Sequence, residues 1–394
     1  MKNQSLYPIV GMNTVSRFDQ LTKSDRTNGR KVHVRDAVNV DLDDGKIEMR
    51  KGARQVSDKP LQYLWTSPLH NDTFGVLDGV WVLVDRSDWS LTPLTTLGHG
   101  PVAHCVLNQS VLVSGDSGLW RYDGTDARRF TLPRPPAPAL MAIPGSLAHG
   151  TWSVAITWLN AQGEESARSR ATQLDASGLR VTLPLPLDQQ VTRVRIYVSS
   201  WNDGALRLAE EVPASTTTVD FPLLGTPGQD APPSHLEPMP GGHFLAQWGG
   251  RLVTASGRTL RFSQPLDYAR HDPRHDFVQL PQRIRFVVAL GTGIWVGQSD
   301  HVVFLAGSGP REMQVVRKAA RPPFPGSAVM LDAELVGEAS AGGRQCALWM
   351  SDNGYVLGTE TGEIVELHAG VLSGLEANRA ATAVCGRRVF TLTG

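Results

Sequence analysis

The 394-residue chain has few cysteines, no long apolar run and no excess of charge of either sign. Its three cysteines, Cys105, Cys346 and Cys385, are far apart and odd in number, which excludes a disulfide framework and a paired C-x-x-C site. No apolar run approaches the roughly 18 residues of a membrane helix, and the first fifteen residues lack the apolar core of a signal peptide. We therefore expect reduced thiols, no membrane span and synthesis in a cytoplasm.

The charge balance excludes a second class of protein. Lysine and arginine total 38 residues, and aspartate and glutamate also total 38, so the formal net charge is zero. A protein whose main task is to hold nucleic acid by its phosphates needs a marked positive excess. Apolar residues make up 41% of the chain and charged residues 19%, which predicts a folded chain with an ample core.

Helical periodicity is almost absent, and short runs rich in Val, Leu, Ile and Trp take its place. Each run is broken by a turn signal, a pattern typical of all-β proteins. One strand–turn–strand pattern recurs, at residues 79–91, 110–124, 250–265, 293–307 and 354–367, and 387–394 has the composition of a closing strand. Its uneven spacing of about 30 to 60 residues compares with the 40–50 residues of propeller blades. The sequence predicts a degenerate β-propeller of undefined blade number.

The long gap between the second and third copies contains a different kind of segment. Proline-rich stretches at 131–145 and 226–242 border it. Inside, apolar and polar residues alternate from Trp152 to Trp158 and again around Val194, Ile196 and Val198, which predicts short antiparallel strands. We expect an inserted immunoglobulin- or fibronectin type III-like sandwich. The predicted domains are an N-terminal arm (1–36), the first part of the propeller (37–145), the inserted sandwich (146–224) and the second part of the propeller (225–394).

Residues 37–50 form the clearest predicted hairpin. With Asp44-Gly45 as a two-residue turn, Leu42 faces Ile47 and Val40 faces Met49 on one side. The same register sets Asp41 against Glu48 on the other side. That pair of like charges is unfavourable unless an arginine or an ion offsets it.

Two fragments within residues 102–120, AHC and GDSG, are those of trypsin-like serine proteases. Such a protease needs its His and Ser on separate barrels, with the Asp between them in the chain, whereas His104 and Ser117 lie 13 positions apart. Gly115 and Gly118 suit a tight turn. The segment predicts a blade meander with strands at 102–107, 110–114 and 119–122. It also resembles the Asp box of sialidase propellers, but that box is a structural turn and its aromatic position holds Arg121.

Other candidate sites are incomplete. A calcium loop around Gly45 would need oxygen donors at Val40, Leu42 and Lys51, so a hairpin turn is favoured. His271 and His275 in the loop HDPRHD could bind a metal, but a polar surface loop is the preferred interpretation. The stretch GTGIWVG lacks the spacing of a dinucleotide site. We expect no catalytic, cofactor-binding or metal-binding residues, no cofactor and no enzymatic activity.

Residues 17–35 hold a local excess of basic side chains. One interpretation is a solvated or partner-facing arm; the other is a segment close to a nucleic-acid backbone. The candidate channel- or partner-facing residues are Arg17, Lys23, Arg26, Arg30, Lys31 and Arg35.

Several of these segments together resemble a known family. Residues 35–56 (RDAVNVDLDDGKIEMRKGARQV) are similar to the N-terminal hairpin of the tail nozzle, or packaged-DNA stabilisation (tail tubular), proteins of short-tailed bacteriophages. Residues 150–166, 179–186 and 191–199 resemble the fibronectin-like insertions of that family, and 258–273 and 293–307 resemble its later blades. The chain departs from the family in its short basic cluster after the first hairpin and in lacking a long tip domain.

The resemblance implies a structural virion protein, made in the host cytoplasm, in the phage tail as a nozzle or head-to-tail connector. It implies a ring of copies, expected to be six-fold, that attaches to the portal or adaptor ring and to other tail proteins. Double-stranded DNA would be retained by the ring until genome ejection. It would then pass through the ring without sequence-specific contacts. The zero net charge suits such a channel, because each contact with a phosphate group would bind the DNA more tightly and oppose its sliding. A cellular propeller that acts as a protein-binding scaffold is the alternative, and a propeller glycoside hydrolase is a third possibility.

Overall fold

The computed structural model describes residues 9–25, 29–38, 40–41, 47–50, 52 and 54–394. Regular structure in these residues is β-strand, with short turns of 3-10 helix at Phe18–Gln20 (η1), Ala333–Leu335 (η3) and Gly337–Ser340 (η4). The predicted all-β class is confirmed. No helix within the described ranges has the length and apolar character needed to cross a membrane. The chain divides into two compact units, one of residues 61–279 and one of residues 1–60 with 280–394.

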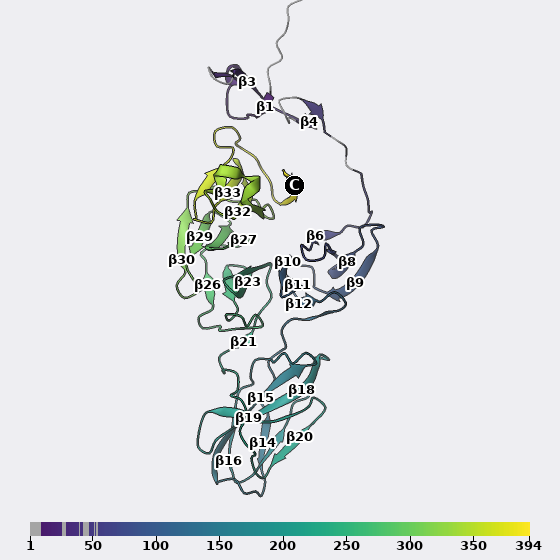
Figure 1. Ribbon diagram of the computed structural model, residues 1–394, viewed down its shortest axis with the longest axis vertical. Coiled ribbons are helices and arrows are strands. Elements are labelled where there is room, and N and C mark those ends of the chain that lie inside the picture. The colour runs from purple at the N-terminus through teal and green to yellow at the C-terminus, as the bar shows by residue number, and fades with distance from the viewer. Residues whose placement is uncertain (1–8, 26–28, 39, 42–46, 51, 53) are drawn as a thin grey trace, which may run out of the picture. The chain divides into compact units, whose positions relative to one another are not determined.

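Five sheets each contain four antiparallel strands joined in chain order, and Figure 1 labels most of their strands. The five strand–turn–strand segments predicted from the sequence fall in five different sheets of this kind, so the repeated pattern is confirmed. Three of the sheets belong to the unit of residues 61–279. Their strands are β6 (Gln62–Thr66), β7 (Thr73–Leu77), β8 (Val80–Val84) and β9 (Leu91–Thr96); β10 (Ala103–Leu107), β11 (Ser110–Gly115), β12 (Gly118–Tyr122) and β13 (Ala127–Arg129); and β22 (Phe244–Trp248), β23 (Arg251–Ser256), β24 (Thr259–Phe262) and β26 (Phe277–Gln279).

Consecutive sheets of this unit share apolar cores. Phe74 and Trp81 from the first sheet pack with Val113 and Tyr122 from the second. Leucines of the second and third sheets form the next core, Leu107, Leu112, Leu119, Leu245 and Leu252. The backbones also approach closely, because a Cβ atom built on Gly241 would lie 2.9 Å from the Cα atom of Gly118. The repeated sheets are therefore packed face to face through buried side chains.

Seven strands between the second and third of these sheets form two antiparallel sheets around one core, drawn in teal in Figure 1. One sheet has the order β14-β17-β20 and the other β16-β15-β18-β19. The predicted alternation is confirmed, since Val194, Ile196 and Val198 are buried in that core. The strands are β14 (Ala139–Ala142), β15 (Gly150–Asn160), β16 (Thr172–Ala176), β17 (Leu179–Thr182), β18 (Val191–Ser199), β19 (Leu206–Pro213) and β20 (Thr218–Phe221). A short pair, β21 (Glu237–Pro238) and β25 (Arg270–His271), follows.

The strand order of this two-sheet region differs from that of an immunoglobulin constant domain. There the first two strands share a sheet, whereas β14 and β15 lie in different sheets here. The last strand, β20, pairs instead with β17 beside β14. The assignment to the immunoglobulin or fibronectin type III class, and the predicted domain boundaries, stay predictions.

The other unit contains two four-stranded sheets that share a core of Phe286, Trp295, Phe304 and Trp349. Their strands are β27 (Ile284–Leu290), β28 (Gly293–Gln298), β29 (Val302–Ala306) and β30 (Gln314–Lys318), then β31 (Val329–Asp332), β32 (Gln345–Ser351), β33 (Gly354–Gly358) and β34 (Ile364–Glu366). Smaller sheets combine β1 (Ile9–Met12), β3 (Gly29–Val34) and β2 (Thr22–Asp25); β4 (Val40–Asp41) and β5 (Glu48–Met49); and β35 (Ala380–Cys385) and β36 (Arg388–Thr393). A strand is thus present at the predicted position, as β36, and it pairs with β35; that it closes a propeller stays a prediction.

The predicted N-terminal hairpin has the expected register. Val40 pairs with Met49 and Asp41 pairs with Glu48. An arginine offsets the like charges, because Arg388 Nη1 lies 3.0 Å from Asp41 Oδ2. The turn predicted at Asp44-Gly45, with Leu42, lies outside the described residues.

Candidate functional site

The basic segment of residues 17–35 forms part of the three-stranded sheet β1-β3-β2. Lys23 on β2 is the cross-strand partner of Lys31 on β3, and Arg30 is the partner of Ser24. The same hairpin therefore carries three of the six candidate residues at adjacent register positions. Arg26 lies outside the described residues.

The remaining two candidates flank the first 3-10 turn. Arg17 precedes η1 and is exposed. Arg35 is exposed too, but it is held in place: Nη1 donates to the Ser16 carbonyl oxygen at 2.6 Å, and the guanidinium lies 5.6 Å from the Phe18 ring centroid. A role of these residues toward a channel or a partner stays a prediction.

The protease-like residues are used in structural contacts. His104 Nε2 accepts a hydrogen bond from Trp81 Nε1 at 3.1 Å, and the imidazole stacks on Trp65 with 5.2 Å between ring centroids. Desolvation among these rings lowers the pKa of His104 to about 3, so the imidazole is neutral at pH 7. The neutral imidazole therefore serves as a hydrogen-bond acceptor in the packing between the first two sheets.

Ser117 is bound elsewhere. Its Oγ donates to the Thr96 carbonyl oxygen at 3.0 Å and accepts from Trp120 Nε1 at 2.9 Å. Ser117 and Asp116 form the two-residue turn between Gly115 and Gly118, which pair across β11 and β12. The predicted meander of three antiparallel strands is confirmed, and the GDSG fragment is its second turn.

The HDPRHD loop is built around two buried aspartates. The Arg274 guanidinium binds both carboxylate oxygens of Asp272 at 2.9 Å, and this hydrogen bonding holds the Asp272 pKa far below its usual range. Asp276 lies 3.5 Å from Arg251 and accepts from the backbone N–H of Asp272. His271 is buried, so the expected surface loop is wrong for that residue. No group of three or more His, Cys, Asp or Glu side chains in the described part of the chain is placed to hold a metal ion.

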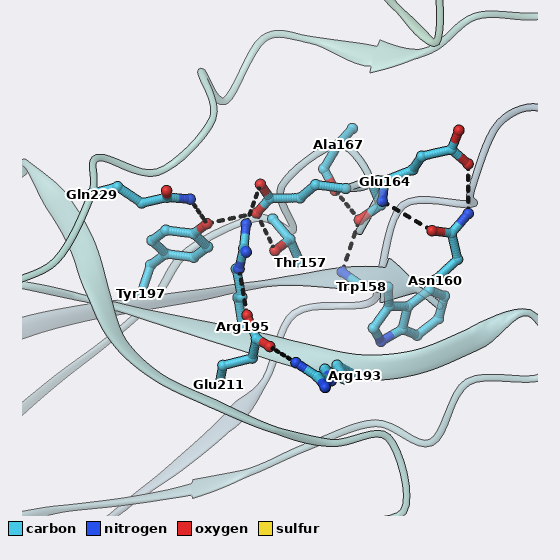
Figure 2. A network of polar contacts seen from close by, with 12 residues as sticks. Thr157, Trp158, Asn160, Glu164, Ala167, Arg193, Arg195, Tyr197, Glu211 and Gln229 are labelled. Carbon is cyan, nitrogen blue, oxygen red and sulfur yellow. Dashed lines mark hydrogen bonds and ion pairs between the residues drawn. The ribbon is translucent and has the colours of Figure 1, made fainter. Parts of the chain in front are cut away.

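A polar network lies on the face of β15 and β18 opposite the core of Val194 and Ile196, and the sequence reasoning did not identify it (Figure 2). The Glu165 carboxylate accepts from Thr157 Oγ1 at 2.6 Å, from Tyr197 OH at 2.6 Å and from Arg195 Nη1 at 3.0 Å. Arg195 also binds Glu211, whose pKa is lowered by its hydrogen bonds to Arg193 and Arg195. In the sequence, the alternation of polar residues at 193, 195 and 197 is the pattern that could have indicated this network.

This network fastens loops to the sheet. Burial, followed by the hydrogen bond to Glu165, raises the pKa of Tyr197 to about 12, so the phenol stays protonated as a donor. Asn160 Nδ2 donates to Glu164 Oε2 and closes the turn after β15. Each strong acceptor thus has a matching donor, and a network satisfied in this way holds its side chains in one arrangement.

Exposed apolar side chains mark a different kind of surface. The outer strand β30 pairs only with β29 among the described strands. Val315 and Val316 on β30 are 48% and 37% exposed, and Arg317 follows them. A sheet edge with apolar side chains is open to another strand.

No family model matches the chain, and no curated protein matches it. Solved structures do match. Apo AztD from Citrobacter koseri is 12% identical, with 84% of this chain and 79% of that chain covered and a TM-score of 0.36. The Neurospora crassa Pan2 WD40 domain is 10% identical, with 77% of each chain covered and a TM-score of 0.32. Kluyveromyces lactis Hsv2 is 9% identical over 85% of this chain and 90% of that chain, with a TM-score of 0.32. TM-scores of this size assign neither a function nor a blade number.

Proposed function

We propose that this chain is a non-enzymatic β-propeller scaffold that binds other protein chains. The observation that carries the proposal is the set of five four-stranded antiparallel sheets in chain order, because a sheet of this kind is the blade of a propeller. The inserted two-sheet region, taken as a fibronectin type III-like module, would add a second binding surface. Propellers leave the outer edges of their blades accessible, which makes them suited to assembling partners.

The outer strand β30 is the first surface to test. A partner strand could add to its free edge, with main-chain hydrogen bonds supplying affinity and Val315 and Val316 supplying apolar contact. Charged side chains at these two positions would oppose such pairing.

The experiment compares two double variants of the full chain in its native source. Val315→Lys with Val316→Lys changes the β30 edge, and Thr92→Lys with Thr96→Lys adds the same charge to exposed positions of β9. Cross-linking followed by mass spectrometry should lose its partner cross-links at Lys318 in the valine variant and keep them in the threonine variant. Absence of any partner cross-link in the unchanged protein would contradict the scaffold proposal.

A second candidate is a virion component of a phage tail, a nozzle or connector ring that forms part of the DNA conduit. The observation that favours it is the β4–β5 hairpin, whose register matches the one expected for the family-like segment 35–56. In this function the partners would be further copies of the chain, the portal or adaptor ring and double-stranded DNA. The propeller would then be one subunit of the ring.

The test of this candidate uses purified particles. Mass spectrometry should find the protein in virions, and images of particles should place it in a ring on the tail axis. If their charges act on DNA or a partner, changing Arg26, Arg30 and Lys31 together to glutamine should leave the stability nearly unchanged, since surface substitutions generally change it by no more than about 0.5 kcal/mol each. The same particles should lose packaged DNA or have incomplete tails. Absence of the protein from virions would rule this candidate out and leave the scaffold proposal standing.

A further inference from the structure

Two leucines stand uncovered on the loop between β17 and β18. Leu185 is 59% exposed and Leu187 is 99% exposed. They alternate with Pro184 and Pro186, and each proline restricts the residue before it to an extended conformation. The loop is therefore stiff, and it presents both leucines to solvent. It also borders a cavity of about 890 Å³, whose lining includes Trp120, Arg134, Trp158 and Gln190.

A second feature of the two-sheet region is a small apolar pocket of about 210 Å³. Trp201 and Leu224 line it, together with Trp152, Leu208 and Pro227. Trp201 is 53% exposed, so one wall of the pocket reaches the solvent. The volume is below the roughly 300–1,000 Å³ of small-molecule sites. A pocket of this size suits an apolar side chain better than a free ligand.

The loop and the pocket lie at opposite ends of β18. The strand has nine residues, Val191–Ser199; the loop precedes its first residue, and Ser199 and Trp201 at its other end line the pocket. At about 3.3 Å per residue the two ends are about 30 Å apart. The leucines therefore do not reach the pocket of their own chain, but they can reach that of another copy. A contact between two different patches is heterologous and joins copies head to tail.

The charges beside the loop and the pocket are complementary. Asp188 is the only charged residue of the loop at 183–190, and one of its carboxylate oxygens accepts from the Gln190 N–H at 3.0 Å. Arg207 is the only charged residue among those that line the pocket. It lies 3.4 Å from Asp230, but the two side chains are 54% and 81% exposed, and such surface pairs are weak. Arg207 is thus available to a carboxylate that arrives with the leucines.

We propose that a second copy of this chain fills the pocket. Leu185 and Leu187 of one copy enter the pocket of the next, and Asp188 of the first binds Arg207 of the second. Two leucines and one ion pair bury less surface than the roughly 1,200 Å² of a standard interface, so each contact is weak by itself. Because every copy keeps one free end, copies add head to tail into a chain or close into a ring. The inference goes beyond the proposed scaffold function and does not rest on it, since both partners are copies of this chain.

Sedimentation velocity of the full chain, from about 10 µM to about 1 mM, covers the range of weak contacts. The unchanged chain should form larger species as its concentration rises. Leu187→Asp should weaken the association about 10- to 100-fold, because it removes one buried leucine contact. Leu266→Asp is the matched control: this leucine is also highly exposed, it lies on a turn of the third sheet, and aspartate tolerates its positive φ of 59°.

Mixing two variants tests the head-to-tail geometry. Leu187→Asp damages the loop and keeps the pocket, whereas Thr226→Trp fills the pocket and keeps the loop, since Thr226 is an exposed residue of the pocket lining. Neither variant should associate with itself. Their equimolar mixture should form a species of two chains and no larger, because one intact loop and one intact pocket remain to meet. Thr226→Ser, which leaves the pocket open, should associate like the unchanged chain.

An exchange of charges separates this contact from non-specific adhesion of apolar surfaces. Arg207→Glu should weaken the association about 2- to 10-fold, and adding Asp188→Arg should restore it. Thermal melts check that each variant is folded.

A monomer at every concentration would overturn the inference, as would equal losses with Leu187→Asp and Leu266→Asp, or a mixture without a species of two chains. Binding of a different protein at the pocket, with no self-association, would overturn it in favour of a foreign partner. The scaffold proposal is tested apart from this one, because its cross-links at Lys318 do not depend on Leu187.

Discussion

Two regions of the same compact unit keep polar side chains away from water in opposite ways. On the face of β15 and β18 opposite the core of Val194 and Ile196, Glu165 and Arg195 lie 3.0 Å apart, with side chains 14% and 22% exposed, and both make further hydrogen bonds. In the core between the first two sheets, His104 is neutral and accepts one hydrogen bond from Trp81. The first region keeps its charges and pairs them, whereas the second excludes charge.

The difference follows from the surroundings. Arg195 and Glu165 have further partners on the neighbouring strands, because Tyr197 on β18 donates to Glu165 and Glu211 on β19 accepts from Arg195. His104 packs against the rings of Trp65, Phe74 and Trp81 and pairs across the strands with Val113, and none of these side chains carries a charge that would pair with an imidazolium. Loss of a charged partner should therefore lower the stability of the region around Glu165 and Arg195. Acid should lower the stability of the aromatic region around His104.

The largest expected effect of a single substitution at pH 7 comes from Glu165→Ala. It leaves Arg195 with Glu211 as its remaining carboxylate partner, and it leaves Tyr197 and Thr157 without this acceptor. We expect a loss of about 3 kcal/mol of unfolding free energy, at the lower end for a broken buried pair because both side chains are partly exposed. Urea unfolding at pH 7 measures it. Glu210→Ala, at an exposed position of β19, should change stability by no more than about 0.5 kcal/mol. Equal effects of the two variants would show that the network contributes no stability.

Acid should also destabilise the folded chain, through His104 in the aromatic region. The pKa of His104 is about 3 in the folded chain and 6.5 ordinarily, so the unfolded chain binds the extra proton between these values. Stability from this group is complete above pH 6.5 and falls by about 1.4 kcal/mol per pH unit as the pH drops toward 3. In His104→Phe this part of the slope should vanish. Unfolding free energies at pH 7, 6, 5 and 4 give both slopes, and identical slopes would mean that His104 is protonated in the fold.

His104→Phe also tests the hydrogen bond itself. The phenyl ring can keep the stacking on Trp65, but Trp81 Nε1 loses its acceptor. A loss of about 1–3 kcal/mol at pH 7 is expected for a buried unpaired donor. A variant as stable as the unchanged chain at pH 7 would show that water or a shifted side chain replaces the imidazole.

The smallest effect concerns Ser117. Its hydroxyl binds Thr96 and Trp120 in a turn, so Ser117→Ala should cost about 1 kcal/mol in a thermal melt. A fluorophosphonate probe should not label Ser117, because the His104 imidazole is bound to Trp81. Labelling would show that the two residues act together after all, and would reopen the question of enzymatic activity.

Local patterns in the sequence were sufficient for the strands. The alternation around Val194 predicted a buried face, and the predicted strands 102–107 and 110–114 left a two-residue gap for a hairpin turn at Asn108-Gln109. The structure contains both, because strand periodicity and turn chemistry are properties of neighbouring residues. Asn108 and Gln109 both have positive φ, 47° and 57°, as a two-residue hairpin turn requires. The register of β4 and β5 was predictable for the same reason.

The candidate sites were less predictable. The six basic residues were chosen for their local charge, which says nothing about what faces them. A cavity lined by Trp120, Arg134, Trp158 and Gln190 was not predicted, because these residues are distant in sequence and appear there as ordinary strand and linker residues.

The sequence by itself determined the all-β class, the repeated strand–turn–strand units and the neutral overall charge, all of which depend on composition and short-range order. Only the tertiary structure decided what the polar residues do. It placed His104 against Trp81, Glu165 against Arg195 and Arg388 against Asp41, pairs separated by 23, 30 and 347 positions. Contacts at such separations depend on how whole sheets pack, and no local pattern encodes them.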